Sequence, residues 1–179
     1  MLGNRYEAQV CSIARTLEVV GERWSLLIVR DALFAGVTRY SEFRENLGIA
    51  TNILKTRLDA LVAAGIMERR STAGGAELYD YVLTAKGRAL GPALVALTEW
   101  GDRWAAPDGA PIVYRHATCG AAVTNQLTCA SCGAIHDAGD VQARPGPGMP
   151  AEYLAVRQRN RRGRSALPTT SEALPSAAS

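Results

Sequence analysis

The chain has 179 residues, of which 47% are hydrophobic, enough for one full domain and a smaller second one. No apolar run approaches the roughly 18 residues of a membrane-spanning helix, and the first ten residues lack the apolar stretch of a secretory signal. We therefore expect a cytoplasmic protein without a membrane partner. The net charge of +3 gives no argument for a polyanionic partner, because the tail from Arg157 onward carries five arginines against one acid, Glu172, and the preceding chain is slightly acidic.

Apolar residues at helical spacing predict two helices at the start of the chain. Between residues 10 and 20, Ile13, Leu17 and Val20 recur at the three-to-four spacing of one helix face. The next segment, "GERWSLLIVRDALFAG", has a similar apolar stripe and lies between two glycines, at 21 and 36. Both segments are predicted to pack on a shared core.

Two further helices follow. Ser41 is a suitable N-cap for a short third helix that ends at Gly48, and Thr51 is a suitable N-cap for a fourth that ends at Gly65. The fourth helix has one apolar face, made of Leu54, Leu58 and Leu61. The remaining side chains of that helix are largely polar, so one of its faces is expected to meet solvent or a partner.

A hairpin and a long helix complete this part of the chain. Residues 66–71 and 78–83 alternate as strands around a turn at Gly74 and Gly75. Thr84 is the expected N-cap of one helix that continues to residue 106. That helix has an apolar seam, made of Leu90, Leu94, Leu97, Trp100 and Trp104. A seam of this length usually packs against a partner.

This order of elements is that of a winged helix-turn-helix, a mainly α fold with a β-hairpin wing. In such a domain the fourth helix presents its first turns to the major groove, and the hairpin can follow the phosphate backbone. The residues predicted to contact double-stranded DNA are Arg39, Thr51, Asn52, Lys55, Thr56, Arg57, Arg69 and Arg70. The alternative is a solvated helix face in an interaction module that does not bind DNA.

Three segments, "CSIARTLEVVGERWSLLIVRDALFAGVTRYSEFRENL", "LKTRLDALVAAGIMERR" and "YVLTAKGRALGPALVALTEWGDRW", closely resemble the HxlR-type family of bacterial winged-helix regulators. The resemblance covers roughly Cys11 to Trp104 and implies a homodimer with one recognition helix in each half-site. It also implies a transcriptional regulator, expected to repress, that responds to electrophiles, oxidants or small metabolites. The residues it places at the dimer interface are Ile13, Leu17, Leu90, Leu94, Leu97, Trp100 and Trp104.

Two departures from that family concern possible functional positions. Redox-responsive members have a reactive cysteine where this chain has Cys11, so Cys11 is a candidate sensor; a buried, inert thiol is the alternative. The proline that usually follows is Ser12 here. The wing sequence "STAGGAE" lacks the Arg-Pro tip common in the family, which weakens the expectation of a phosphate contact at the wing tip.

A second domain is predicted after a Pro/Gly-rich linker at residues 107–111. Residues 112–150 contain two knuckle-like patterns, each with two ligands three positions apart and a glycine after the second, which can supply four ligands to tetrahedral zinc. The predicted ligands are His116, Cys119, Cys129 and Cys132. The segment is thus read as a small all-β domain similar to a zinc ribbon.

Other readings of this C-terminal part stay open. The cysteines at 129 and 132 could form a redox switch or belong to a metal-free turn, and a thiol-redox protein is an alternative function. Nucleophile elbows, Gly-rich phosphate loops and two-histidine helices do not occur, so we expect no enzyme activity. Residues 151–179 are rich in Arg, Ser, Ala and Pro and are predicted to be disordered.

Overall fold

The structure is a computed structural model that describes residues 6, 9–71 and 79–152. By its internal contacts the chain divides into two compact units, Met1–Asp140 and Val141–Ser179. Most of the predicted tail, from residue 153 on, lies outside the described residues. Within the described part of the chain, every helix is too short or too polar to cross a membrane.

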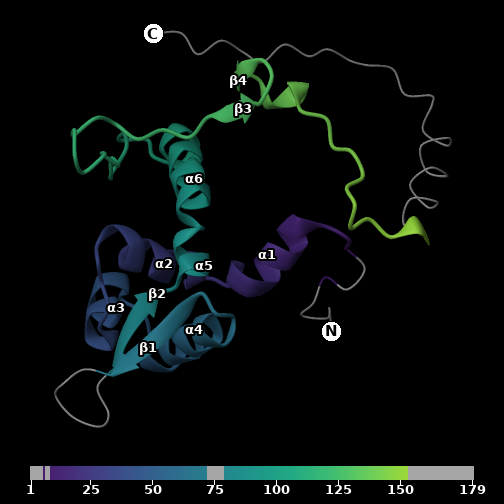
Figure 1. The fold of residues 1–179 in the computed structure, drawn as a ribbon. Coiled ribbons are helices and arrows are strands. Elements are labelled where there is room, and N and C mark those ends of the chain that lie inside the picture. The colour runs from purple at the N-terminus through teal and green to yellow at the C-terminus, as the bar shows by residue number, and fades with distance from the viewer. Residues whose placement is uncertain (1–5, 7–8, 72–78, 153–179) are drawn as a thin grey trace. The chain divides into compact units, whose positions relative to one another are not determined.

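The first four helices occur where their apolar spacing predicts them. They are α1 (Ser12–Val20), α2 (Ser25–Phe34), α3 (Tyr40–Leu47) and α4 (Thr51–Ala63). Figure 1 shows α2, α3 and α4 gathered around a small hairpin, and contacts join α4 to each of the other three helices. This arrangement confirms the winged helix-turn-helix.

The hairpin is formed by β1 (Met67–Ser71) and β2 (Tyr79–Leu83), which pair antiparallel from Met67 opposite Leu83 to Ser71 opposite Tyr79. The predicted turn at Gly74 and Gly75 lies outside the described residues. The segment before α3 joins the other side of β2, because the backbone N–H of Tyr81 donates to the Thr38 carbonyl at 2.8 Å. The hairpin is thereby anchored to the helices on both sides.

Both predicted N-caps of the central helices are wrong. Helix α3 has Arg39 at its N-cap rather than Ser41, because the Glu42 carboxylate accepts the Arg39 backbone N–H at 3.1 Å and sets the start of the helix. Helix α4 has Ala50 at its N-cap, and Thr51 is already its first residue. The Thr51 carbonyl accepts a hydrogen bond from the Tyr40 hydroxyl at 2.7 Å, which ties the two helices together.

The long helix predicted from residue 85 to residue 106 is two helices, α5 (Ala85–Arg88) and α6 (Gly91–Trp104). The Thr84 side chain accepts the Gly87 N–H at 3.2 Å, so its predicted capping role is confirmed. The helix breaks after α5 because Pro92 has no N–H to donate to a preceding carbonyl, and proline is tolerated only in a first turn.

The core lies between α2, α3, α4 and the hairpin. Its largest fully buried side chains are Phe43, Ile28, Leu54, Leu58, Leu61, Met67 and Val29. The three leucines come from one face of α4, as their spacing predicts. Burying a Leu, Ile or Phe side chain contributes about 1.5–3 kcal/mol, so this face holds α4 firmly in one orientation.

Residues 112–140 contain two small antiparallel pairings. One is the pair of β3 (Leu127–Cys129) with β4 (Gly133–Ile135), and the other is a single bridge between Arg115 and Ala122. A short 3-10 helix, Ala138–Asp140, follows. The all-β character of this segment is therefore limited to short pairings, and a zinc ribbon stays a prediction.

Residues 112–140 belong to the same compact unit as the helices, rather than to a unit that begins after residue 111. The Tyr114 ring lies 4.3 Å from the Phe34 ring between centroids, and the Asn125 N–H donates to the Glu99 carboxylate at 2.8 Å. These contacts place part of the C-terminal segment against α2 and α6.

Gly87 is predicted to be intolerant of any side chain. A Cβ at this position would collide with the Ile66 carbonyl oxygen and approach the Leu83 side chain at 2.9 Å. Gly87→Ala should lower the free energy of unfolding by on the order of 1–3 kcal/mol, measured by urea denaturation. Gly101→Ala in α6, where a Cβ meets open space, is the matched control and should be neutral or stabilising by up to about 1 kcal/mol. Equal effects at the two positions would contradict the close approach of α5 to the hairpin.

Candidate nucleic-acid interface

The exposed face of α4 is polar and begins at the first residue of the helix. Thr51, Asn52, Lys55 and Thr56 are exposed, while the leucine face is buried. The Thr56 hydroxyl donates to the Asn52 backbone carbonyl at 2.9 Å, and both residues are exposed. Asn and Lys at the start of an exposed helix are the side-chain types that meet base edges and phosphates in a major groove.

A shared carboxylate joins α4 to the hairpin. Lys55 Nζ lies 2.7 Å from Asp59 on the next turn of α4, and Arg69 of β1 forms an ion pair with the same carboxylate. The Lys55 hydrogen bond lowers the pKa of Asp59 below its ordinary value and raises the pKa of Lys55, so both groups stay charged at neutral pH. Two cations and one anion therefore leave a net positive charge where helix and hairpin meet.

Arg57 lies on the opposite flank of α4 from Lys55. Its guanidinium is 2.7 Å from the Glu22 carboxylate in the turn before α2, and its side chain is only 22% exposed. The Nε of Arg57 is buried and has no hydrogen-bond partner among the residues that the structure describes. Arg57 therefore links α4 to the turn between α1 and α2.

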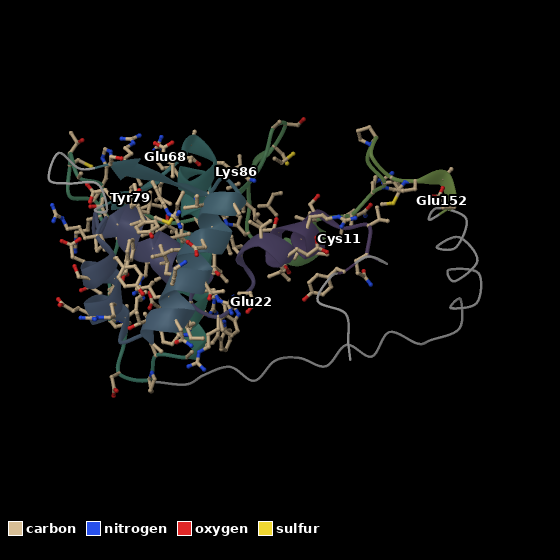
Figure 2. All side chains as sticks on the ribbon, turned by 90° about the horizontal axis from the view of Figure 1, so that it is seen from below. Cys11, Glu22, Glu68, Tyr79, Lys86 and Glu152 are labelled. Atoms are coloured by element: carbon tan, nitrogen blue, oxygen red, sulfur yellow. The ribbon has the colours of Figure 1, made fainter. Side chains whose placement is uncertain are left out.

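The remaining predicted DNA contacts lie beside the hairpin. Arg70 pairs with Glu68 on its own strand at 2.6 Å, and its side chain is largely exposed. Arg39 is exposed at the N-cap of α3, where its backbone bridges to Asp80 of β2. Glu22 is the partner of Arg57 and Glu68 is the partner of Arg70. In Figure 2 these two acidic residues lie well apart on the helical domain.

Sequence reasoning missed the carboxylates that hold these cations. Asp59 follows Lys55 by four residues, a helical spacing that favours a pair, and that signal was present in the sequence. Glu22 is 35 positions from Arg57, and no local pattern connects them. The sequence alone could have paired Lys55 with Asp59, but the partners of Arg57 and Arg69 required the fold.

The apolar side chains predicted at a dimer interface divide into two groups. Leu94 is buried in the core and Leu90 packs partly against it. The others are exposed in the single chain, namely Ile13, Leu17, Leu97, Trp100 and Trp104. Trp100 is 63% exposed and Ile13 70%. The first group stabilises the subunit, and the second leaves large apolar side chains exposed on α1 and on α6.

Cys11 is the N-cap residue of α1 and is exposed (Figure 2). It has extended backbone geometry, and the Arg15 N–H donates to its carbonyl at 3.1 Å. The alternative for Cys11 was a buried, inert thiol. The structure instead leaves this residue exposed to solvent. Its reactivity stays a prediction.

The four predicted zinc ligands form two pairs. His116 Nδ1 lies 3.2 Å from Cys119 Sγ, and backbone N–H groups of Cys132 and Ser131 lower the pKa of Cys129. Among the described residues, no three His, Cys, Asp or Glu side chains gather closely enough to hold one metal ion. The donor types suit zinc, but this arrangement does not bring the four together.

Comparison with known proteins connects this geometry to a family. The HxlR-like helix-turn-helix family matches residues 19–109, the part of the chain that contains α2 to α6. The chain belongs to the HxlR-like helix-turn-helix family. A relative in Mycobacterium tuberculosis, the uncharacterised HTH-type transcriptional regulator Rv3095, is 43% identical over 155 residues, which cover 86% of this chain and 96% of the relative. That similarity extends beyond the family domain.

Two solved structures support the same assignment. PA1607, a proposed transcription factor, is 40% identical with a TM-score of 0.69, covering 76% of this chain and 96% of that one. PA1374 of Pseudomonas aeruginosa, another proposed transcription factor, is 39% identical with a TM-score of 0.59, covering 83% of this chain and 99% of that one. The HxlR-like domain and its exposed α4 are thus shared with proteins described as transcription factors.

The two flanks of α4 should respond differently to mutation. Arg57→Ala removes a largely buried side chain and leaves Glu22 without this cation, so we expect a loss of unfolding free energy on the order of 1 kcal/mol. Lys55→Ala, at a side chain that is 70% exposed, should leave thermal stability nearly unchanged. Thermal denaturation followed by circular dichroism measures both. An unchanged melting temperature for Arg57→Ala would show that the pair with Glu22 contributes nothing to the fold.

Proposed function

We propose that this protein regulates transcription by binding promoter DNA through α4 and the hairpin. Family membership makes it a DNA-binding transcriptional regulator of the helix-turn-helix type. The observation that carries the mode of binding is the polar outer face of α4, which adjoins Arg69 of β1 through Asp59. In this mode Asn52 and Thr56 face base edges, and Lys55, Arg69 and Arg70 face phosphate oxygens.

Asp59 has a definite role in this proposal. In the free protein it neutralises part of the charge of Lys55 and Arg69 and holds both side chains near the junction of helix and hairpin. A DNA phosphate offers the same cations an alternative oxygen anion. Binding then exchanges an exposed ion pair, worth little in water, for phosphate contacts that release counterions.

Lys55→Ala tests the interface directly. We expect affinity for a duplex from the protein's own promoter region to fall about tenfold, and the slope of log affinity against log salt to fall by about 1. Fluorescence anisotropy at several salt concentrations measures both quantities. Arg144→Ala, an exposed cation outside the helical domain, is the control and should leave both unchanged.

An unchanged affinity in Lys55→Ala would move the DNA contact to another surface. If the wild-type protein showed no salt-dependent DNA affinity at all, the interaction-module alternative would replace this proposal.

The dimer is the second part of the proposal. The exposed apolar side chains of α6 support it, because Leu97, Trp100 and Trp104 share one helix face by their spacing and monomeric proteins rarely leave such a group in water. A symmetric pair of such surfaces would place two copies of α4 on two half-sites. A dimer on a promoter occludes polymerase without further contacts, which favours repression.

Trp100→Asp should therefore shift the protein from dimer to monomer in sedimentation velocity. The charge would be buried without a partner in the assembled interface, at a cost of several kcal/mol, while in the free subunit Trp100 is exposed. Val141→Asp, at an exposed valine in the second unit, is the control and should stay dimeric. A variant at Trp100 that remains fully dimeric would place the interface elsewhere.

Zinc binding and thiol sensing complete the proposal as separate hypotheses. His116, Cys119, Cys129 and Cys132 would hold a structural zinc if the metal drew the two pairs together, and their donor types and knuckle spacing support this hypothesis. The exposed position of Cys11 supports it as the oxidant-sensitive thiol.

One measurement separates these hypotheses. We expect about one zinc per chain by inductively coupled plasma mass spectrometry, with Cys11 as the thiol that labels fastest in the native protein. Cys119→Ser should abolish the zinc, and Cys11→Ser should leave it in place. Metal-free wild-type protein with four equally reactive thiols would remove both hypotheses together.

A further inference from the structure

A pocket lies between the C-terminal half of α2 and the extended segment 112–115. It encloses about 360 Å³, within the size range of small-molecule sites. Its lining includes Arg30, Asp31 and Phe34 of α2, together with Ile112, Val113 and Tyr114. Both walls belong to the same compact unit. The residues that line this pocket are different from those of the DNA interface described above.

One residue of the pocket lining, Asp31, has a buried carboxylate with one oxygen unused. The side chain of Asp31 is 7% exposed, and its Oδ1 accepts Arg30 Nε at 2.8 Å and pairs with Arg30 Nη2 at 2.7 Å. Its Oδ2 is buried and has no hydrogen-bond partner within the described part of the chain. An acceptor left unsatisfied in this way destabilises the free protein. Because Oδ2 has almost no accessible surface in the free protein, a ligand hydroxyl would reach it after a shift of the side chains that cover it.

The walls of the pocket are aromatic and aliphatic. The rings of Phe34 and Tyr114 lie 4.3 Å apart between centroids at an interplanar angle of 34°. Phe34 is 42% exposed, and the aliphatic side chains of Ile112 and Val113 are 49% and 65% exposed. Apolar surface that is open beside a ring pair favours a flat apolar occupant, because both stacking and burial stabilise it.

The charged side chains at the edge of the pocket limit which hydrogen-bond donor a ligand can carry. Arg30 already bonds to Asp31, and the Arg115 guanidinium donates to the Gly120 carbonyl at 2.9 Å. A cationic ligand would meet two guanidinium groups and one carboxylate, so the local charge disfavours it. A neutral donor such as a hydroxyl avoids that repulsion.

We propose that this pocket binds a small neutral aromatic molecule that carries a hydroxyl group, with the hydroxyl donating to Asp31 Oδ2 and the ring packed on Phe34 and Tyr114. The site gives the protein an effector position away from the DNA interface. Helix α2 contacts α3, α4 and β2, so an occupant of this pocket adjoins the helix that supports the DNA-binding elements.

The test uses the full-length protein and two probes of similar shape, p-cresol and 4-methylanisole. Both carry the same ring and methyl group, but the methoxy oxygen of 4-methylanisole has no hydrogen to donate. In ¹H–¹⁵N correlation spectra we expect p-cresol to shift Phe34 and Tyr114 resonances saturably, with an affinity about tenfold higher than that of 4-methylanisole. Equal affinities would overturn the role of Asp31.

Variants locate the binding in the pocket. Val113→Trp fills the space and should abolish the p-cresol shifts, while Val141→Trp, at an exposed valine in the second unit, should leave them unchanged. Tyr114→Ala removes one ring wall and should weaken p-cresol at least several-fold, which keeps the test valid if the Val113 variant misfolds. Retained binding in both pocket variants would overturn the proposal.

A second copy of the chain could cover the pocket instead. In that case p-cresol would fail to bind the wild-type dimer, and Val113→Trp would change the sedimentation of the protein; this result would also overturn the proposal. Because binding is measured without DNA, a negative result leaves the DNA-binding function untouched.

Discussion

Everything in the DNA-binding domain depends on the burial of one face of α4. Leu54, Leu58 and Leu61 are essentially inaccessible and lie in the core formed with α2, α3 and the hairpin. Because these three side chains cannot leave the core without a large loss of apolar burial, the rotation of α4 about its axis is determined. The polar face therefore points outward, and the start of the helix is presented as a rigid surface.

Carboxylates on the two flanks of α4 give its cations different roles. Asp59 holds Lys55 and Arg69 at an exposed junction, where a phosphate can compete for them. Glu22 holds Arg57 where the side chain is largely buried, so this cation serves the packing of α4 on the turn before α2. Two cations that are two residues apart in one helix thus lie in different surroundings, Lys55 exposed and Arg57 largely buried.

The segment after α6 adds to the domain rather than merely following it. Tyr114 packs against Phe34 of α2, and the pocket that results contains a buried acceptor and an apolar wall. Helix α2 links this pocket to the recognition elements through its contacts with α3 and α4. A regulator with this layout can bind DNA on one surface of α4 and a small molecule at a separate place.

The sequence by itself determined the positions of the helices and the hairpin, because periodic apolar residues report directly which face each element buries. It also indicated the polar surface of α4 and the family. The caps at Arg39 and Ala50 were not predicted, and neither was the break before Pro92, although a proline without an N–H is a local signal that the sequence carries. Only the tertiary structure decided that Arg69 pairs with Asp59, that Arg57 pairs with Glu22, and that Asp31 and Tyr114 line one pocket, because such contacts join residues far apart in the chain.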